Sequence, residues 1–239
     1  MAEHPSTNQA PVLITKTIPG ITTITINRPQ RRNAIDDPTA QKLTAAFLTF
    51  EEDPTQKVIP DAGANFRSGN RYAAHVVSPS NHVQGRNRGP IGPSRMQLTK
   101  PVIAAVSGHA VAGGLELALL ANICVVEEDA VFGVFCRRFG VPLIDGGTVR
   151  LQAVVGLERA LDMILTGSAV GATEALSMGL ANRVVAEGKG VEEAMALARQ
   201  IVGFPQACRN VDRASCYYTA YNTRSLRMLG RESLRGELE

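Results

Sequence analysis

Apolar and polar residues alternate near the start of the chain, in the stretch 11–27, "PVLITKTIPGITTITIN". Isoleucine, valine and threonine dominate this stretch, and Pro19-Gly20 divides it into halves. An alternation with a period of two is typical of strands that have one buried face, and a Pro-Gly pair marks a turn. The pattern therefore predicts a β-hairpin.

A helical period follows in "PTAQKLTAAFLTFEED". Apolar side chains recur three and four positions apart at Leu43, Ala46, Phe47 and Phe50, which predicts one buried helix face. The helix is expected to begin at Pro38, with either Asp36 or Asp37 as its N-cap.

From Lys100 onward, apolar strands alternate with helical periods. "PVIAAVSG" predicts a buried strand, "GGLELALLANIC" a helix that begins directly after glycines, and "VVEEDAVFGV" a strand with a turn. "GGTVRLQAVVGLERALDMILTG" predicts two helices on either side of a glycine, and "GATEALSMGLANRVV" a short helix followed by a strand. "VEEAMALARQIV" and the polar tail from Phe204 predict two final helices. This alternation indicates the α/β class.

Residues 58–95 carry no clear period. Prolines, glycines and asparagines are frequent there, and Pro60 and Asp61 interrupt the apolar run that begins at Val58. Because proline removes a donor from a β-ladder, we expect any strand here to be short and the remainder to be loop.

The composition narrows the function classes. The chain has 239 residues, 44% of them apolar, and a net charge of +3, which does not indicate a nucleic-acid partner. The four cysteines form no CxxC pair and have no metal-ligand spacing with a histidine, so no metal site is expected. The sequence has no run of eighteen consecutive apolar residues, so it predicts no membrane-spanning helix. The start has no apolar core of the signal-peptide type, so we expect a cytoplasmic protein.

One charged residue stands inside an apolar helix in "SGHAVAGGLELALLANIC", residues 107–124. Gly113 and Gly114 precede Glu116 at the expected helix start, where the first amide groups have no internal partner. An oxygen that gains negative charge could be held there, and Glu116 could move a proton beside it. The alternative is that the glycines allow the helix to pack closely against its neighbours and that Glu116 forms a salt bridge. The motifs GxGxxG, GxxxxGK[ST] and GxSxG are absent.

The segment "KPVIAAVSGHAVAGGLELALLANICVV" resembles a signature of the enoyl-CoA hydratase/isomerase (crotonase) superfamily. Further segments resemble other family signatures in the family order: "ITTITINRPQRRNAI", "GANFRSG", "FGVPLIDGGTVRLQAVVGLERALDMILTG" and "ATEALSMGLANRVV". The resemblance covers roughly residues 12–200. It implies a crotonase-like ββα spiral over residues 1–190, with 58–95 poorly patterned, and a short helical region over 191–239.

The resemblance also implies an acyl-CoA enzyme that stabilises a thioester enolate. The backbone amides of Ser68 and Gly113 would form the oxyanion hole, and Glu116 would be the acid/base. Substrate-binding positions would be Ser68, Gly69, Asn70, Arg71, Gly113 and Gly114. No cofactor is implied, since coenzyme A is part of the substrate. The implied assembly is a homotrimer or hexamer.

The chain departs from the hydratase pattern at the second catalytic glutamate, where it has Cys136. The thiol is either a packing residue or a nucleophile or acid/base, and the adjacent Arg137 and Arg138 could lower its pKa. Asp145 is the other candidate for a second catalytic group, although an aspartate before two glycines is also an ordinary turn or helix-cap residue. Two functions stay open: a hydratase or isomerase, and a non-catalytic acyl-CoA binder or assembly subunit.

Overall fold

The computed structural model describes residues 10–64 and 89–221, with the backbone alone at 61–64. The described residues fall into two compact units, divided between Val202 and Gly203. The boundary expected after residue 190 stays a prediction. The elements are β1 (Val12–Ile18), β2 (Ile21–Ile26), η1 (Pro29–Arg31), α1 (Asp37–Glu52), β3 (Ile59–Ala64), η2 (Pro93–Arg95), β4 (Val102–Ser107), β5 (His109–Val111), α3 (Gly113–Ala118), β6 (Ile123–Glu127), β7 (Val131–Gly133), η3 (Phe135–Phe139), α4 (Gly147–Val155), α5 (Leu157–Thr166), β8 (Ala169–Gly171), α6 (Ala172–Ser177), β9 (Arg183–Val185), α7 (Gly190–Gly203) and α8 (Gln206–Tyr221).

Two sheets organise the first unit. The larger has the strand order β1-β2-β3-β4-β6-β9, and the smaller has the order β5-β7-β8. The β1–β2 pair is antiparallel, with Ile18 opposite Ile21 across the Pro19-Gly20 turn, so the predicted hairpin is confirmed. The remaining pairs of the larger sheet are parallel, and helices connect most of them.

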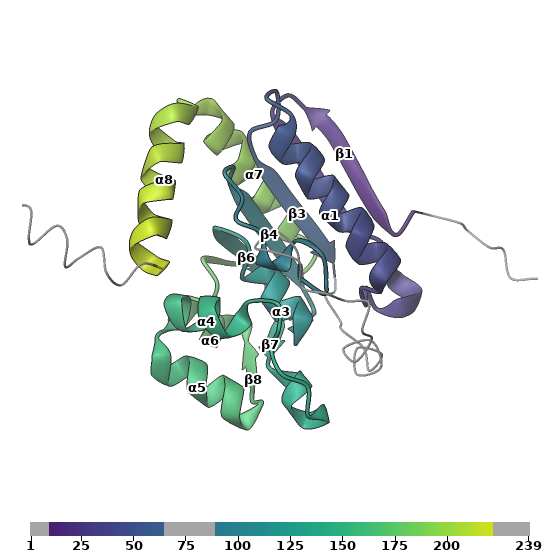
Figure 1. Cartoon of the computed structure of the whole chain (residues 1–239), viewed down its shortest axis with the longest axis vertical. Coiled ribbons are helices and arrows are strands. Elements are labelled where there is room, and N and C mark those ends of the chain that lie inside the picture. Colours follow the sequence, from purple (N-terminus) through teal and green to yellow (C-terminus); the bar gives the residue numbers. More distant parts are fainter. Residues whose placement is uncertain (1–9, 65–88, 222–239) are drawn as a thin grey trace, which may run out of the picture. The chain divides into compact units, whose positions relative to one another are not determined.

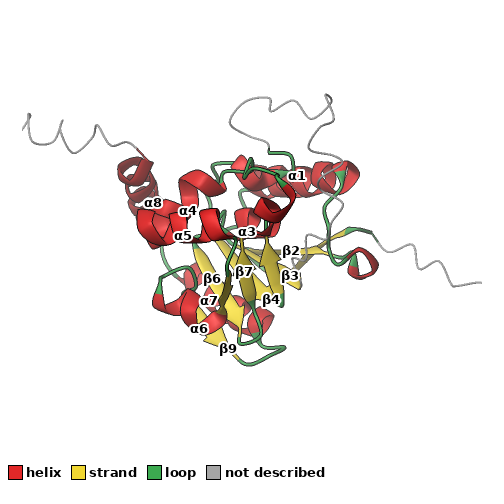
Figure 2. Cartoon of the chain, turned by 90° about the horizontal axis from the view of Figure 1, so that it is seen from below, coloured by secondary structure: helices red, strands yellow, loops and turns green. Residues whose placement is uncertain are grey.

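Each face of the larger sheet is covered by its own helices (Figures 1 and 2). Along β4, Val102, Ala104 and Val106 belong to the cluster that includes the apolar face of α1, whereas Ile103 and Ala105 face the cluster that includes α7. Successive side chains of a strand point to opposite faces, so a strand buried on both faces is apolar throughout. This arrangement explains the unbroken apolar run "VIAAV".

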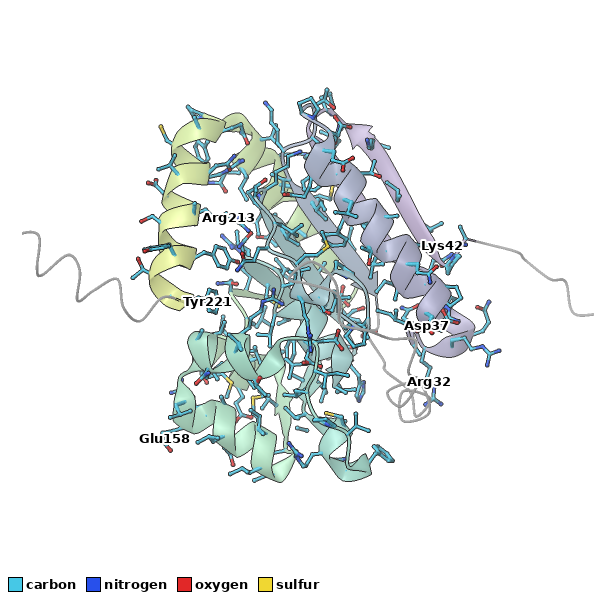
Figure 3. The ribbon with its side chains drawn as sticks, in the orientation of Figure 1. Arg32, Asp37, Lys42, Glu158, Arg213 and Tyr221 are labelled. Atoms are coloured by element: carbon cyan, nitrogen blue, oxygen red, sulfur yellow. The ribbon has the colours of Figure 1, made fainter. Side chains whose placement is uncertain are left out.

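Helix α1 forms where its period predicts. Asp36 is the N-cap, because its side chain accepts a hydrogen bond from the Thr39 backbone N–H, and Pro38 lies in the first turn. Leu43, Phe47 and Phe50 are fully buried. Figure 3 shows the side chains of Arg32 and Asp37 at the N-terminal end of this helix.

The expectation of a short, broken strand at Pro60 is wrong. Strand β3 has six residues and pairs with β4 along its whole length, from Ile59 opposite Val102 to Ala64 opposite Ser107. The Ile59 N–H donates to Pro101 O, on the β4 side. Successive backbone N–H groups alternate sides, so the nitrogen of Pro60 faces β2, where the ladder has a single registered pair, Ile24 with Asp61. The absent N–H of Pro60 therefore removes no hydrogen bond between β3 and β4.

The second unit contains α8, and every described residue of this helix is at least partly exposed. Along it, Arg213 lies over the ring of Tyr217, which stacks on Tyr221. Among the described residues, no helix has both the length and the apolar character that a membrane crossing requires.

Candidate active site

The site begins at the junction between β5 and α3. Ala112 ends the extended segment with φ 52° and ψ −123°, a conformation that side-chain-bearing residues rarely adopt. Its N–H donates to Gly133 O at 2.9 Å, which ties the junction to β7. Gly113 follows as the first residue of α3, so its N–H has no acceptor within the helix. The expected donor position is therefore at a helix start.

Helix α3 is shorter than its sequence predicts. It ends at Ala118, and β6 begins at Ile123, so "LLAN" forms the connection and "IC" opens the strand. The six helical residues still place Glu116 one turn after Gly113. Residues Leu115 and Leu117 are buried on either side of it, so the packing of the helix fixes the backbone from which the Glu116 side chain projects.

Glu116 is 3% exposed, and its Oε1 accepts two backbone hydrogen bonds. The donors are the N–H groups of Asp145, at 2.8 Å, and of Gly147, at 2.9 Å. Gly147 is the first residue of α4. The carboxyl group is therefore held by the start of another helix, and it makes no ion pair within the described residues.

Burial raises the pKa of Glu116 to about 7, and the negative charge of Asp145 acts in the same direction. The two backbone hydrogen bonds and the positive charge of Arg95 oppose this shift. A carboxyl group with a pKa near neutral pH exchanges protons readily with a reacting group. Glu116 thus has the properties that proton transfer at neutral pH requires.

Asp145 is a second buried carboxyl group, 3% exposed, and it does not cap α4. The N-cap of that helix is Gly146, with no side-chain cap. The Oδ1 of Asp145 instead accepts from the Ile91 N–H at 3.1 Å and from the Ser94 hydroxyl. The helix-cap interpretation is wrong, because the carboxylate satisfies donors of a distant segment. Burial raises the pKa of Asp145, against these hydrogen bonds and the charges of Arg95 and Arg150.

The sequence did not single out Ser94, Arg95 or Arg150. Arg95 donates to the Ile144 carbonyl, and Arg150 donates to the carbonyls of Ser94 and Met96. These contacts join η2 to the start of α4. Arg150 stands in the amphipathic helix α4, where a single arginine is ordinary, and the signal that could have indicated a buried turn is the "GPIGPS" run before Arg95.

Cys136 lies in η3, half-buried against the main hydrophobic cluster. Burial raises the pKa of its thiol, and the charge of Glu116 raises it further, so the expected lowering by arginine does not prevail. Arg137 and Arg138 donate to the carbonyls of Ile164 and Gly167 at the end of α5. The geometry supports packing rather than nucleophilic attack, because a thiol with a raised pKa is protonated at neutral pH.

The loop expected to supply the first oxyanion donor falls outside the described residues, and so do the expected site residues Ser68, Gly69, Asn70 and Arg71. Among the candidates that the structure describes, Gly113 and Gly114 share α3 with Glu116, and Asp145 contacts Glu116 through its backbone N–H. Cys136 lies close enough to Glu116 for the carboxylate charge to raise the pKa of its thiol. Within the ranges that the structure describes, no group of three or more histidine, cysteine, aspartate or glutamate side chains is arranged to hold a metal ion.

Comparison with known proteins decides the family. A model of the family described as "Enoyl-CoA hydratase/isomerase" matches residues 16–223. The chain belongs to the enoyl-CoA hydratase/isomerase family. Among the curated members, the carnitinyl-CoA dehydratase of Escherichia coli (strain K12) is 37% identical over 188 residues, which are 75% of this chain and 70% of that protein.

Solved structures of the enoyl-CoA hydratase/isomerase family show the same fold. An enoyl-CoA hydratase from Mycobacterium marinum superposes with a TM-score of 0.81 at 26% identity, over 96% of this chain and 90% of the other. A carnitinyl-CoA hydratase from Mycobacterium avium gives a TM-score of 0.79 at 29% identity, over 87% and 81%. The predicted crotonase-like fold is confirmed, and so is the family resemblance.

Proposed function

We propose that the protein catalyses an enolate reaction on an acyl-CoA thioester, with Glu116 as its acid/base. The observation that carries this proposal is the buried Glu116 carboxyl group, with a pKa of about 7, one helical turn after the Gly113 N–H. Membership of the enoyl-CoA hydratase/isomerase family supports an acyl-CoA substrate. The thioester oxygen would accept a hydrogen bond from Gly113, and from Ser68 in the loop outside the described residues.

Glu116 would act first as a base. Its carboxylate takes a proton from a carbon next to the acyl double bond or the thioester. The electron pair of the broken C–H bond moves onto the thioester oxygen as an enolate. When the enolate collapses, the same carboxyl group returns the proton to another carbon. One carboxylate suffices for this isomerisation, whereas syn hydration uses two, and the second position holds Cys136.

Turnover assays with the purified protein test the proposal. Crotonyl-CoA, longer 2-enoyl and 3-enoyl thioesters and carnitinyl-CoA form the panel, the last because curated relatives are named carnitinyl-CoA dehydratase. Glu116→Gln keeps an acceptor oxygen for the Asp145 and Gly147 amides but cannot carry the proton. We expect it to lower kcat by a factor of about 10² to 10⁴. An unchanged kcat would exclude Glu116 as the acid/base.

A non-catalytic acyl-CoA binder is the second candidate. Cys136 in place of a second glutamate favours it, since hydration chemistry then lacks one carboxylate. Calorimetric titration with acetyl-CoA and crotonyl-CoA separates the two functions. Binding without turnover of any thioester would support the binder, and turnover that Glu116→Gln abolishes would reject it.

Assembly into trimers or pairs of trimers stays a prediction. Large apolar side chains on α4 and α5 are exposed, and a partner subunit would cover them: Val149, Val154, Leu157, Leu161 and Leu165. Several large exposed apolar side chains on two consecutive helices are consistent with an interaction site. Light scattering coupled to size-exclusion chromatography measures the mass, and a monomer would contradict the prediction.

A further inference from the structure

We propose that Asp145 is a positioning residue, whose side chain holds the segment 89–95 against the starts of α3 and α4 while its backbone holds Glu116. This inference rests on the proposed function for its catalytic consequence but not for its structural part. Asp145 contributes to both contacts at once. Its Oδ1 accepts from the Ile91 N–H and the Ser94 hydroxyl, and its own N–H donates to Glu116 Oε1 at 2.8 Å. A displacement on one side of this residue is therefore transmitted to the other.

The segment 89–95, which we call the clasp turn, is shaped around the carboxylate. Gly89 and Gly92 exchange both backbone hydrogen bonds, at 2.8 and 3.0 Å. A Cβ atom on Gly89 would lie 2.1 Å from Ser94 Oγ and 2.4 Å from Asp145 Oδ1. Only glycine fits this close approach, so the backbone of the turn lies against the Asp145–Ser94 contact.

The other side of the clasp turn lies against α1. A Cβ atom on Gly92 would lie 2.7 Å from Ala40 O, and φ of Gly92 is +99°. Two arginines add hydrogen bonds at the end of the turn. Arg150 donates to Ser94 O and, at 3.0 Å, to Met96 O, while Arg95 donates to Ile144 O. The turn is thus fixed by specific polar contacts, of which Asp145 makes the most buried.

The clasp turn reaches the proposed oxyanion donor through Ile91. The side chain of Ile91 is 1% exposed. Its Cδ1 and Cγ2 atoms lie 3.4 and 3.5 Å from where a Cβ of Gly113 would stand. Ile91 therefore forms an apolar wall beside Gly113. Because Asp145 accepts from the Ile91 N–H, loss of that bond would free the wall to move.

The carboxylate of Asp145 has a structural contact that the carboxylate of Glu116 lacks. Both hydrogen bonds that its carboxylate accepts within the described residues fall on Oδ1, and both come from the clasp turn. The charged and titratable groups around Glu116 are Asp145, Arg95 of η2 and Cys136 of η3, and Arg150 of α4 acts on Asp145. Of these, Asp145 is the one whose negative charge raises the pKa of Glu116. Its charge and its hydrogen bonds are separable by substitution.

Two substitutions separate the charge of Asp145 from its hydrogen bonds. Asp145→Asn keeps an acceptor oxygen for Ile91 and Ser94 but removes the charge, whereas Asp145→Ala removes both. Ser94→Ala removes one donor, and Asp162→Asn, on the exposed side of α5, is the matched control. Hydrogen–deuterium exchange of the peptide that contains Ile91 reports the clasp turn directly. Turnover of the best thioester between pH 5 and 9 reports Glu116.

We expect Asp145→Ala to speed exchange of the Ile91 amide by about tenfold or more, because a charged acceptor is lost. Its kcat/KM should fall by a similar factor or more. Asp145→Asn should keep the Ile91 amide protected and retain most of kcat. The rising limb of its pH profile should move to lower pH, because the charge that raises the pKa of Glu116 is gone. This shift reports the charge of Asp145 alone, so it separates the charge from the hydrogen bonds that hold the clasp turn.

The outcomes that overturn the inference are distinct from failure of the proposed function. Unchanged exchange of the Ile91 amide in Asp145→Ala would show that no clasp exists, whether or not the protein is an enzyme. Loss of kcat in Asp145→Asn equal to that in Asp145→Ala, with the amide protected in both, would make Asp145 a catalytic residue. If the wild type turns over no thioester, the proposed function fails, and the exchange experiment still decides the structural part.

Discussion

The carboxyl group of Glu116 lies directly against the backbone of Gly147. The Gly147 N–H donates to Glu116 Oε1 at 2.9 Å, and a Cβ atom on Gly147 would lie 2.8 Å from Glu116 Cγ and 2.9 Å from Oε1. The helix that begins at Gly147 can approach the carboxyl group this closely because the residue has no side chain. Gly147 thereby determines where the carboxyl group lies.

Gly147→Ala should therefore displace Glu116 without unfolding the protein. We expect kcat to fall by a factor of about 10² when the acid/base moves by an ångström. The free energy of unfolding should fall by about 1–3 kcal/mol, as for other overpacked sites. Gly171→Ala is the control, because φ of Gly171 is −79° and nothing lies within 4 Å of its Cβ position. Equal kcat values for the two variants would contradict the prediction.

The raised pKa of Glu116 makes a prediction about stability. Its pKa is 4.5 in the unfolded chain and about 7 in the fold, so between these values the folded state binds more protons than the unfolded state. Stability therefore falls as pH rises from 4.5 to 7, and the penalty is complete above pH 7. A shift of this size corresponds to about 3 kcal/mol.

Glu116→Gln removes this penalty, since glutamine has no charge to bury and still accepts the two amides. The variant and the wild type should be about equally stable at pH 4.5. At pH 8 the variant should be more stable, by up to about 3 kcal/mol. Urea denaturation at both pH values measures the difference. A Glu116→Gln variant less stable than wild type at pH 8 would contradict the burial argument.

Much of the fold follows from periodicity in the sequence. The β1–β2 hairpin and α1 could be predicted because their patterns are local: alternation around Pro19-Gly20, and apolar side chains three and four apart from Leu43 onward. Strand β3 could not be predicted, because Pro60 is compatible with a central strand only when its nitrogen faces β2, the neighbouring strand with a single registered pair. That orientation is a property of the sheet and not of the segment.

The site is less predictable than the fold. Glu116 could be identified because a charge inside an apolar helix is itself a local anomaly. The partners of Asp145 could not be, since Ser94 lies 51 residues away and its serine is ordinary in its own segment. The strained Ala112 gave no signal, because alanine is a normal residue before a helix and its hydrogen bond to Gly133 joins segments 21 residues apart. Long-range polar contacts of this kind become visible only in the folded chain.

A second buried glutamate provides a contrast with Glu116. Glu127 is 6% exposed, and its Oε1 accepts from the Gly190 N–H at 2.9 Å, at the start of α7. A Cβ on Gly190 would lie 3.0 Å from the same oxygen. Glu127 and Gly190 thus join the end of β6 to α7 on the sheet face opposite α1, which indicates a structural role.

Glu127→Ala should lower the free energy of unfolding by about 1–3 kcal/mol, because a buried donor at a helix start loses its acceptor. Glu127→Gln should lower the free energy of unfolding much less, since its amide oxygen still accepts a hydrogen bond from the Gly190 N–H. Neither variant should change kcat, in contrast to Glu116→Gln. Urea midpoints and turnover of the same preparations test both parts. A large loss of kcat with unchanged stability in Glu127→Ala would contradict the structural role.

The last prediction concerns the conformation that places Gly113. Ala112 has φ 52° and ψ −123°, where a residue with a Cβ is strained by about 1–3 kcal/mol. Glycine adopts these angles without strain, at the cost of more freedom in the unfolded chain. The two effects oppose each other, so Ala112→Gly should leave the free energy of unfolding nearly unchanged or raise it.

Ala118→Gly is the matched control, because Ala118 is a buried residue of the same short helix with ordinary helical geometry. Ala118→Gly should lower the free energy of unfolding by about 1 kcal/mol through helix propensity alone, and further through loss of the buried methyl group. Urea denaturation of the two variants gives the difference. If Ala112→Gly were as destabilising as Ala118→Gly, the backbone at Ala112 would store no strain. The direction of the Gly113 N–H would then be determined by the hydrogen bond from Ala112 to Gly133 alone.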